Sequence, residues 1–258
     1  MRELLEAVAA GERSPAEAEA ELRGYVTSED GRFDAARSDR RGIPEAILAE
    51  GKTADQVANL ATTAIETTGR ALVTRLDQAQ TEVLEERLET DFPQATVDRR
   101  RSTLLATSAA HDRPTLVTRV AIVTAGTVDG PVADEAELVC LDAGMTIDRI
   151  EDVGVASLTR ILDQRDRLRE ADVIIVAAGR EGALPTVVAG LVDTPVIGVP
   201  VSSGYGHGGD GEAALAGMLQ SCTVLSVVNV DAGFVAGAQA TLIAQAIDVA
   251  VNPKNEAD

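Results

Sequence analysis

The chain has 258 residues and a formal net charge of −19, from 42 acidic and 23 basic residues. Its length suits one large domain, or one typical domain with a smaller one. Aromatic residues make up only 2%, but 45% of the chain is hydrophobic, which predicts a folded core and not a disordered acidic tail. The acidic excess is spread along the chain, as in proteins adapted to high salt. It argues against nucleic-acid binding, which needs clusters of Lys and Arg to neutralise phosphates.

Cysteine content and the N-terminal segment indicate a cytoplasmic protein. The two cysteines, Cys140 and Cys222, are too few for a disulfide framework, and neither belongs to a C-x-x-C motif. The N-terminal segment MRELLEAVAAGERS lacks the basic and apolar regions of a signal peptide. Because no window approaches ~18 consecutive apolar residues, we expect no membrane span.

Residues 1–114 are expected to form a mainly helical region. Ser14 and Pro15 have the pattern of a helix start, and Thr53 is placed to cap a helix that runs from Ala54 to about Thr67. A short extended segment is expected before that helix, and a helical or mixed pattern continues after it. This region could serve as a lid over another domain or as a packing module without chemistry.

Residues 115–258 alternate regularly between apolar strands and helices. Strands are expected at 120–124, 172–178, 195–199 and 224–230, and a weaker one near 146–151, with helices of about ten to fifteen residues between most of them. This alternation is typical of βαβ units, in which helices cover both faces of a parallel sheet. The expected fold class is therefore α/β, a three-layer sandwich of the flavodoxin-like or Rossmann-like kind.

The stretch 198–234 carries the strongest functional pattern. Five glycines fall within eight residues between Gly204 and Gly211, which suits a backbone that approaches a ligand closely. Cys222 follows an apolar helix, and we place it at the edge of the sheet where ligands bind. The alternative is a buried structural thiol beside glycines that only make turns.

Two further turns follow expected strands. Gly126, Thr127 and Asp129 lie just before a helix start, where backbone N–H groups favour an anion. Glu181 stands between Gly179 and Gly182, so it could act as a base or a metal ligand. A glutamate in that position can also serve only as a helix-start charge.

Several motifs together resemble the LarB family, which makes the first intermediate of the nickel-pincer cofactor of lactate racemase. The matching segments are GIPEAILAEGKT, TAGTVDGPVADEA, EDVGVASLTR, AAGREGALPTVVAGLVDTPVIGVPVSSGYG, MLQSC and VVNVDAGFVAG. The C-terminal domain of that family is similar to PurE, the aminoimidazole ribonucleotide (AIR) carboxylase or mutase. The resemblance implies a synthase that carboxylates C5 of the pyridinium ring of nicotinic acid adenine dinucleotide with CO2. It also hydrolyses the phosphoanhydride, so the products are pyridinium-3,5-biscarboxylic acid mononucleotide and AMP.

The resemblance also implies roles for particular residues. Cys222 matches the nucleophile, and Glu181 is the candidate base, with Asp129 or Asp152 as the alternative. The implied substrate-binding set is Gly126, Thr127, Asp129, Asp152, Arg160, Gly179, Ser203, Gly204, Tyr205, Asn229 and Asp231. Mg²⁺ on the pyrophosphate is the expected ion, with its protein ligands unassigned, and CO2 or bicarbonate is the co-substrate. Because both related families form homo-oligomers, an octamer is expected.

The proposed chemistry explains why a cysteine is needed. C5 of an electron-poor pyridinium ring cannot attack CO2. Addition of a thiolate to a ring carbon gives a neutral, enamine-like ring whose C5 is nucleophilic. A cysteine suits this reaction because it is a strong nucleophile and also a good leaving group.

Two positions depart from the related families. Ala183 stands where PurE proteins have a histidine, and Thr159 stands where LarB members commonly have one, although Arg160 remains beside it. His207 lies in the glycine-rich loop and is not expected to be catalytic. The alternatives to the synthase are an aminoimidazole ribonucleotide carboxylase or mutase, and a nucleotide-binding module without catalysis.

Overall fold

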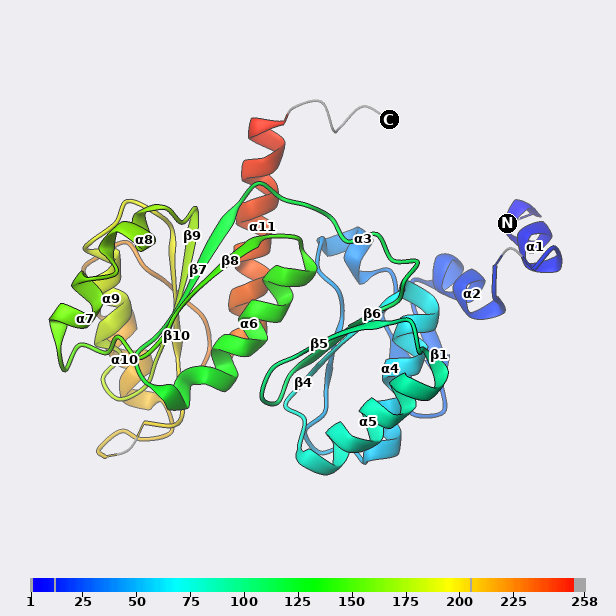
Figure 1. Ribbon diagram of the computed structural model, residues 1–258, viewed down its shortest axis with the longest axis horizontal. Coiled ribbons are helices and arrows are strands. Elements are labelled where there is room, and N and C mark those ends of the chain that lie inside the picture. Colours follow the sequence, from blue (N-terminus) through cyan, green and yellow to red (C-terminus); the bar gives the residue numbers. More distant parts are fainter. Residues whose placement is uncertain (1, 12, 205, 253–258) are drawn as a thin grey trace. The chain divides into compact units, whose positions relative to one another are not determined.

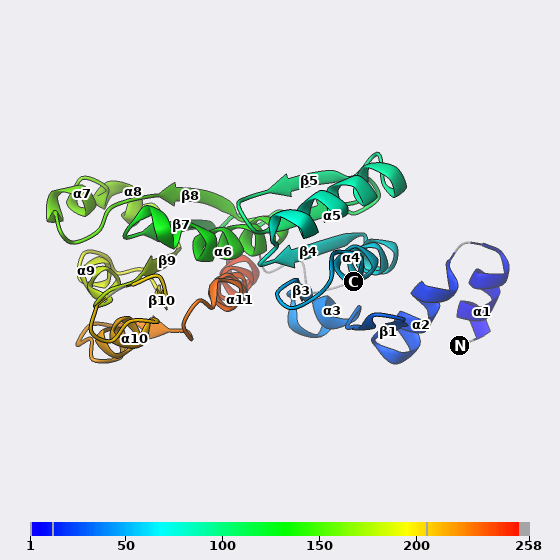
Figure 2. The same cartoon turned by 90° about the horizontal axis from the view of Figure 1, so that it is seen from below.

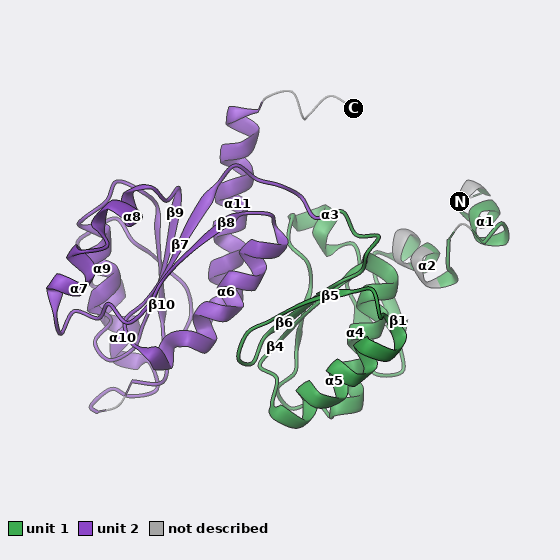
Figure 3. Ribbon diagram, viewed as in Figure 1, with its two compact units in different colours: residues 1–112 green, residues 113–258 purple. Residues whose placement is uncertain are grey.

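The computed structural model describes residues 2–11, 13–204 and 206–252. The chain divides into two compact units, Met1–Asp112 and Arg113–Asp258, drawn in different colours in Figure 3. Each unit has its own sheet and its own hydrophobic core.

The second unit contains a five-stranded sheet in the order β11-β10-β9-β7-β8, with every neighbouring pair parallel. Its strands are β7 (Arg119–Thr124), β8 (Thr146–Ile150), β9 (Val173–Ala178), β10 (Val196–Pro200) and β11 (Ser226–Val227). The α/β fold with a parallel sheet is therefore confirmed. The last strand has only two residues, whereas a strand over 224–230 was expected. Val224 lies outside the sheet and is 93% exposed.

Helices cover both faces of this sheet (Figures 1 and 2). On one face lie α6 (Gly130–Asp142) and α11 (Gly233–Val251); on the other lie α7 (Leu158–Leu162), α8 (Arg165–Arg169), α9 (Ala183–Ala189) and α10 (Glu212–Leu219). Successive side chains along each strand point to opposite faces of the sheet, which produces two separate cores. In β9, Val173 and Ile175 belong to the core under α6 and α11, whereas Ile174 and Val176 belong to the opposite core.

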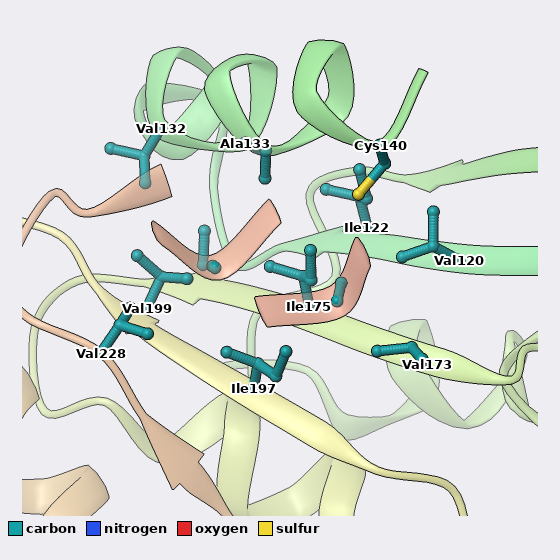
Figure 4. Close-up of a cluster of buried hydrophobic side chains, with 14 of the residues drawn as sticks. Val120, Ile122, Val132, Ala133, Cys140, Val173, Ile175, Ile197, Val199 and Val228 are labelled. Carbon is teal, nitrogen blue, oxygen red and sulfur yellow. The ribbon is translucent and has the colours of Figure 1, made fainter. Parts of the chain in front are cut away.

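Figure 4 shows the core under α6 and α11, in which Cys140 lies beside Ile122 and other apolar side chains of the sheet. Gly237 of α11 faces α6, and a Cβ added there would lie 2.8 Å from the carbonyl oxygen of Ala136 and 2.9 Å from Cβ of Val139. Cys140 is fully buried, its Sγ lies 3.8 Å from the carbonyl oxygen of Gly237, and burial raises its pKa to about 12. Cys140 is therefore a structural thiol.

The N-terminal unit is mixed α/β, so the expectation of a mainly helical region is wrong. It contains a four-stranded sheet in the order β3-β4-β6-β5 and a separate hairpin. The strands are β1 (Val26–Ser28), β2 (Gly31–Phe33), β3 (Ala46–Leu48), β4 (Arg70–Thr74), β5 (Thr96–Arg99) and β6 (Leu104–Thr107); the helices are α1 (Arg2–Ala9), α2 (Pro15–Arg23), α3 (Arg37–Arg41), α4 (Ala54–Thr68) and α5 (Gln78–Asp91). Strands of three to five residues are too short for alternation to separate them from helical segments.

The expected cap of α4 is confirmed. The Thr53 side chain accepts a hydrogen bond from the Gln56 amide, and the Gln56 side chain accepts one from the Thr53 amide, which completes a capping box. The buried face of α4 packs against the sheet of this unit through Val57, Ala61 and Ala64.

One helix of the described residues, α11, is long and apolar enough by length and composition to cross a membrane. Ala236, Ala240 and Ala244 on one face of α11 are fully buried in the core of the second unit. The opposite face leaves Val235 and Leu242 half exposed. These data alone are weak evidence for a membrane role, because core helices meet the same criterion.

Substitution of Gly237 tests the close packing of α6 and α11. Gly237→Ala is expected to lower the free energy of unfolding by about 1–3 kcal/mol, because its Cβ overpacks the helix contact. The matched control is Gly190→Ala, where the nearest atom to the new Cβ is 3.4 Å away and the expected change is within about 0.5 kcal/mol. Denaturant unfolding measures both; equal effects would contradict the packing argument.

Candidate active site

The site lies where the order of the strands along the sheet reverses. From β7 the chain crosses to β8 on one side, and from β8 it returns to β9 on the other side of β7. The turns after β7 and β9 therefore diverge, which opens a crevice at the carboxyl ends of these strands. A cavity of about 460 Å³ occupies this position, a size typical of ligand sites.

Glycines build the walls of this cavity by letting backbone segments touch. A Cβ on Gly204 would lie 2.5 Å from the amide nitrogen of Arg180, so the loop after β10 lies directly against the turn after β9. A Cβ on Gly217 would lie 2.1 Å from the carbonyl oxygen of Glu181, and α10 therefore holds this turn from the other side. These contacts fix the backbone of residues 179–182.

Glu181 lines the cavity and is solvent-exposed. Its neighbours Arg180 and Gly182 both adopt the left-handed conformation, with φ values of 54° and 67°. Such a turn projects successive side chains in different directions, and it places Glu181 at the start of α9. The carboxylate is thus accessible to a bound molecule, as a base must be.

Asp129 forms the second acidic group of the cavity. Its Oδ2 accepts a hydrogen bond from the Gly126 amide at 2.8 Å, and its Oδ1 lies 3.5 Å from the Ser203 hydroxyl. Burial raises the pKa of Asp129 above its ordinary value, and the nearby charge of Asp231 also raises it. The hydrogen bonds to its carboxylate lower this pKa, but burial has the larger effect. Asp231 is itself fixed by accepting a hydrogen bond from the Ser202 amide.

Arg160 and Asp152 meet at the rim. The Arg160 guanidinium lies 3.1 Å from the Asp152 carboxylate and donates to the Asp152 carbonyl oxygen. The Asp152 amide in turn donates to the Thr124 hydroxyl at the end of β7. Arg160 also lines the cavity, so its guanidinium lies where it can pair with an anionic ligand.

Within one chain, Cys222 does not belong to this cavity, which corrects its expected position. A helix that follows a parallel strand runs back along the sheet, so the end of α10 lies at the amino ends of the strands. Cys222 is exposed there and lines a separate cavity of about 510 Å³ beside Pro195 and Val196. The structure thus places Cys222 and Glu181 at opposite edges of the sheet.

The remaining expected residues divide between the cavity and its surroundings. Gly126, Asp129, Arg160, Gly179, Glu181, Ser203 and Gly204 line it, whereas Thr127, Asp152, Asn229 and Asp231 do not. Thr127 begins the short helix η1 (Thr127–Asp129) and is exposed. Tyr205 lies outside the described residues.

Both parts of the chain match known protein families. Residues 25–105 match the LarB/PurE-like N-terminal domain, and residues 119–257 match AIR carboxylase. A protein of Methanocaldococcus jannaschii, which carries the description "uncharacterized", is 36% identical over 255 residues, covering 95% of this chain and 97% of that protein.

The chain belongs to the LarB family. Members of this LarB/PurE-like group are carboxylases, and the two matched domains fall within the two compact units of the structure. The order of the domains agrees with the motifs found along the sequence.

In this LarB-family protein, the residues that suit Mg²⁺ are few. Among the described residues, no group of three or more His, Cys, Asp or Glu side chains could hold a metal ion. Asp129 and Asp231 are close enough to interact electrostatically. Asp231 lies outside the cavity lining, so the described residues form no preformed Mg²⁺ site, and an ion there would take its ligands mainly from phosphate and water.

Arg180 and Val128 also line the cavity, although neither was predicted as a site residue from the sequence. Arg180 could have been predicted, because it is a cation between Gly179 and Glu181 in the glycine-bounded turn after β9. Val128 could not, because an apolar residue before a helix is ordinarily part of a core.

The raised pKa of Asp129 predicts a pH dependence of stability. A raised folded pKa means that the folded chain binds this proton more tightly than the unfolded chain, whose reference pKa is 3.8. The stabilisation is therefore complete below the unfolded pKa and is lost as the pH rises through the folded pKa. We expect the unfolding free energy of the native protein, relative to Asp129→Asn, to fall over this window.

Denaturant unfolding of both proteins at a series of pH values measures this difference. The Asn side chain keeps an oxygen that can accept from Gly126 but cannot ionise, which makes it the matched reference. A difference that rises with pH would show that Asp129 has a lowered pKa and would contradict the burial argument.

Proposed function

We propose that this protein carboxylates C5 of the pyridinium ring of nicotinic acid adenine dinucleotide and hydrolyses its phosphoanhydride. The observation that carries the proposal is the cavity at the switch point of the sheet, which contains Glu181 and two arginines but no histidine among its described lining residues. Ala183 lines it where PurE proteins have a histidine. This arrangement disfavours the aminoimidazole ribonucleotide reaction and suits the LarB reaction.

The carboxylation proceeds in four steps. Because Cys222 and this cavity lie at opposite edges of one sheet, the thiolate is supplied by another copy of the chain in the expected homo-oligomer. This Cys222 thiolate forms a C–S bond to a ring carbon, which converts the pyridinium to a neutral enamine. C5 then attacks CO2, forming the new C–C bond and an iminium. Glu181 takes the proton from C5, which regenerates the enamine. Expulsion of the thiolate breaks the C–S bond and restores the aromatic ring.

The positive groups of the cavity suit the charges of this substrate. Arg160 and Arg180 can pair with the ring carboxylate and the phosphates. Mg²⁺ beside Asp129, held mainly by pyrophosphate oxygens and water, would neutralise charge during attack by water. Water cleaves the P–O–P linkage, so the reaction consumes one CO2 and one water and yields AMP and the dicarboxylated mononucleotide.

Two substitutions separate the steps. Cys222→Ser is expected to lower product formation at least about 1,000-fold while binding of the dinucleotide is retained, because a serine hydroxyl is a poor nucleophile without a base. Glu181→Gln is expected to lower it about 100- to 10,000-fold, the usual range for loss of a general base. Because proton removal is blocked, Glu181→Gln should accumulate a covalent Cys222 adduct with the mass of the nucleotide and CO2.

Liquid chromatography of the nucleotides and intact-protein mass spectrometry measure these effects. Cys140→Ala is the matched cysteine control: Cys140 is buried away from the cavity, so turnover should persist and adduct formation should be unchanged. Turnover by Cys222→Ser at the native rate would eliminate the covalent mechanism.

A further inference from the structure

We infer that Arg149 positions two walls of the Glu181 cavity by joining the start of α6 to the turn after β8. This inference rests on the proposed function, because the walls concerned carry Asp129 and Arg160. Arg149 lies outside the described lining of the cavity, so it is a positioning residue that acts through these two side chains.

Arg149 lies near the end of β8, which is an edge strand of the five-stranded sheet. Side chains two residues apart along a strand point to the same face. Because Ile147 packs against the core under α6 and α11, the Arg149 side chain also lies on the face that α6 covers. Only 18% of this side chain is exposed.

The guanidinium of Arg149 contacts the first two turns of α6. Its Nη2 donates to the Asp134 carboxylate at 3.0 Å, and its Nη1 donates to the Glu137 carboxylate at 2.9 Å. Nη2 also lies 3.4 Å from the carbonyl oxygen of Gly130, the residue that follows Asp129. Because a guanidinium is a rigid planar fork, these contacts fix the rotation of α6 against β8.

The same side chain also holds the turn that follows β8. Its Nη2 donates to the Glu151 carboxylate at 3.2 Å. Glu151 directly precedes Asp152, whose carboxylate and carbonyl oxygen both bind Arg160 at the rim. One guanidinium therefore connects the wall that carries Asp129 with the wall that carries Arg160.

Backbone hydrogen bonds join the turns after β7 and β8 independently of Arg149. The Val153 amide donates to the Thr124 carbonyl oxygen at 3.1 Å, and the Gly154 amide donates to the Ala125 carbonyl oxygen at 2.9 Å. These bonds fix the path of both turns, so the fold does not depend on Arg149 alone.

The orientation of Asp129 depends on α6 as well as on these turns. Asp129 is the N-cap residue of α6, so a rotation of this helix moves its carboxylate relative to the Gly126 amide. Loss of the Arg149 contacts should therefore leave the sheet intact and loosen the alignment of Asp129.

The substitutions must not leave a buried charge without compensation. Asp134 is only 2% exposed, so removal of the Arg149 charge alone would destabilise the fold. Arg149→Lys keeps the charge but replaces the fork with a single ammonium. The set Arg149→Gln/Asp134→Asn/Glu137→Gln removes the positive charge together with both carboxylates.

Steady-state turnover of the dinucleotide measures the effect on the site. We expect kcat/KM to fall about 10-fold in Arg149→Lys and about 100-fold in the neutral set, because a small displacement of a site group has effects of this size. The matched control is Arg167→Gln. Arg167 anchors the same strand from α8, donating to the Arg149 carbonyl oxygen at 2.9 Å and pairing with Asp148. This control should stay within about twofold of the native value.

Hydrogen exchange tests the alignment without turnover. The Gly126 amide donates to Oδ2 of Asp129 at 2.8 Å, so its exchange rate reports how firmly this carboxylate is held. In both Arg149 variants we expect exchange at Gly126 to be about tenfold faster, the factor for loss of one ordinary hydrogen bond. The amides of β7 and β9, and all amides of Arg167→Gln outside α8, should exchange at native rates.

The two measurements together decide the inference. Native exchange at Gly126 in both Arg149 variants, or native kcat/KM in both, would overturn it. Faster exchange throughout β7 and β9 would overturn it as well, because that pattern shows a general loss of stability. If the native protein does not turn over the dinucleotide, faster exchange confined to Gly126 and its turn would preserve the positioning role and reject the proposed reaction.

Discussion

The structure of this site depends on the direction of a parallel sheet. All carboxyl ends of β7, β9 and β10 lie at one edge, and every helix that returns between strands ends at the other. This arrangement gathers Glu181, Asp129 and Arg160 around one cavity. The same arrangement sends Cys222, at the end of a returning helix, to the opposite edge. Both the composition of the cavity and the separation of Cys222 from it follow from strand direction.

Close backbone contacts then determine the shape of the cavity. Gly204 against Arg180 and Gly217 against Glu181 leave no room for a Cβ, so the turn after β9 is held from two sides. The left-handed conformations at Arg180 and Gly182 give this turn its form. A carboxylate on such a fixed turn has a defined position, which a general base requires.

Much of the second unit could be predicted from the sequence, because its buried strands are long apolar runs separated by helices. The turns of the site could also be predicted, because they follow these strands and contain glycines. The position of Cys222 could not be read correctly, because sequence order shows that it follows α10 but not which end of the sheet that helix reaches. The N-terminal sheet was missed since β3 and β4 have only three and five residues. The exposure of Val128 and Val224 could not be predicted either, because apolar residues next to helices and strands are ordinarily buried.

The most direct test of the central claim is turnover of the native protein with nicotinic acid adenine dinucleotide, Mg²⁺ and ¹³C-labelled bicarbonate in high salt. Mass spectrometry should show AMP and a pyridinium mononucleotide that carries one labelled carboxyl group. Conversion of aminoimidazole ribonucleotide in place of the dinucleotide would contradict the account and assign the cavity to the purine reaction. Binding of the dinucleotide without any labelled product would contradict it as well, and would reduce the protein to a nucleotide-binding module.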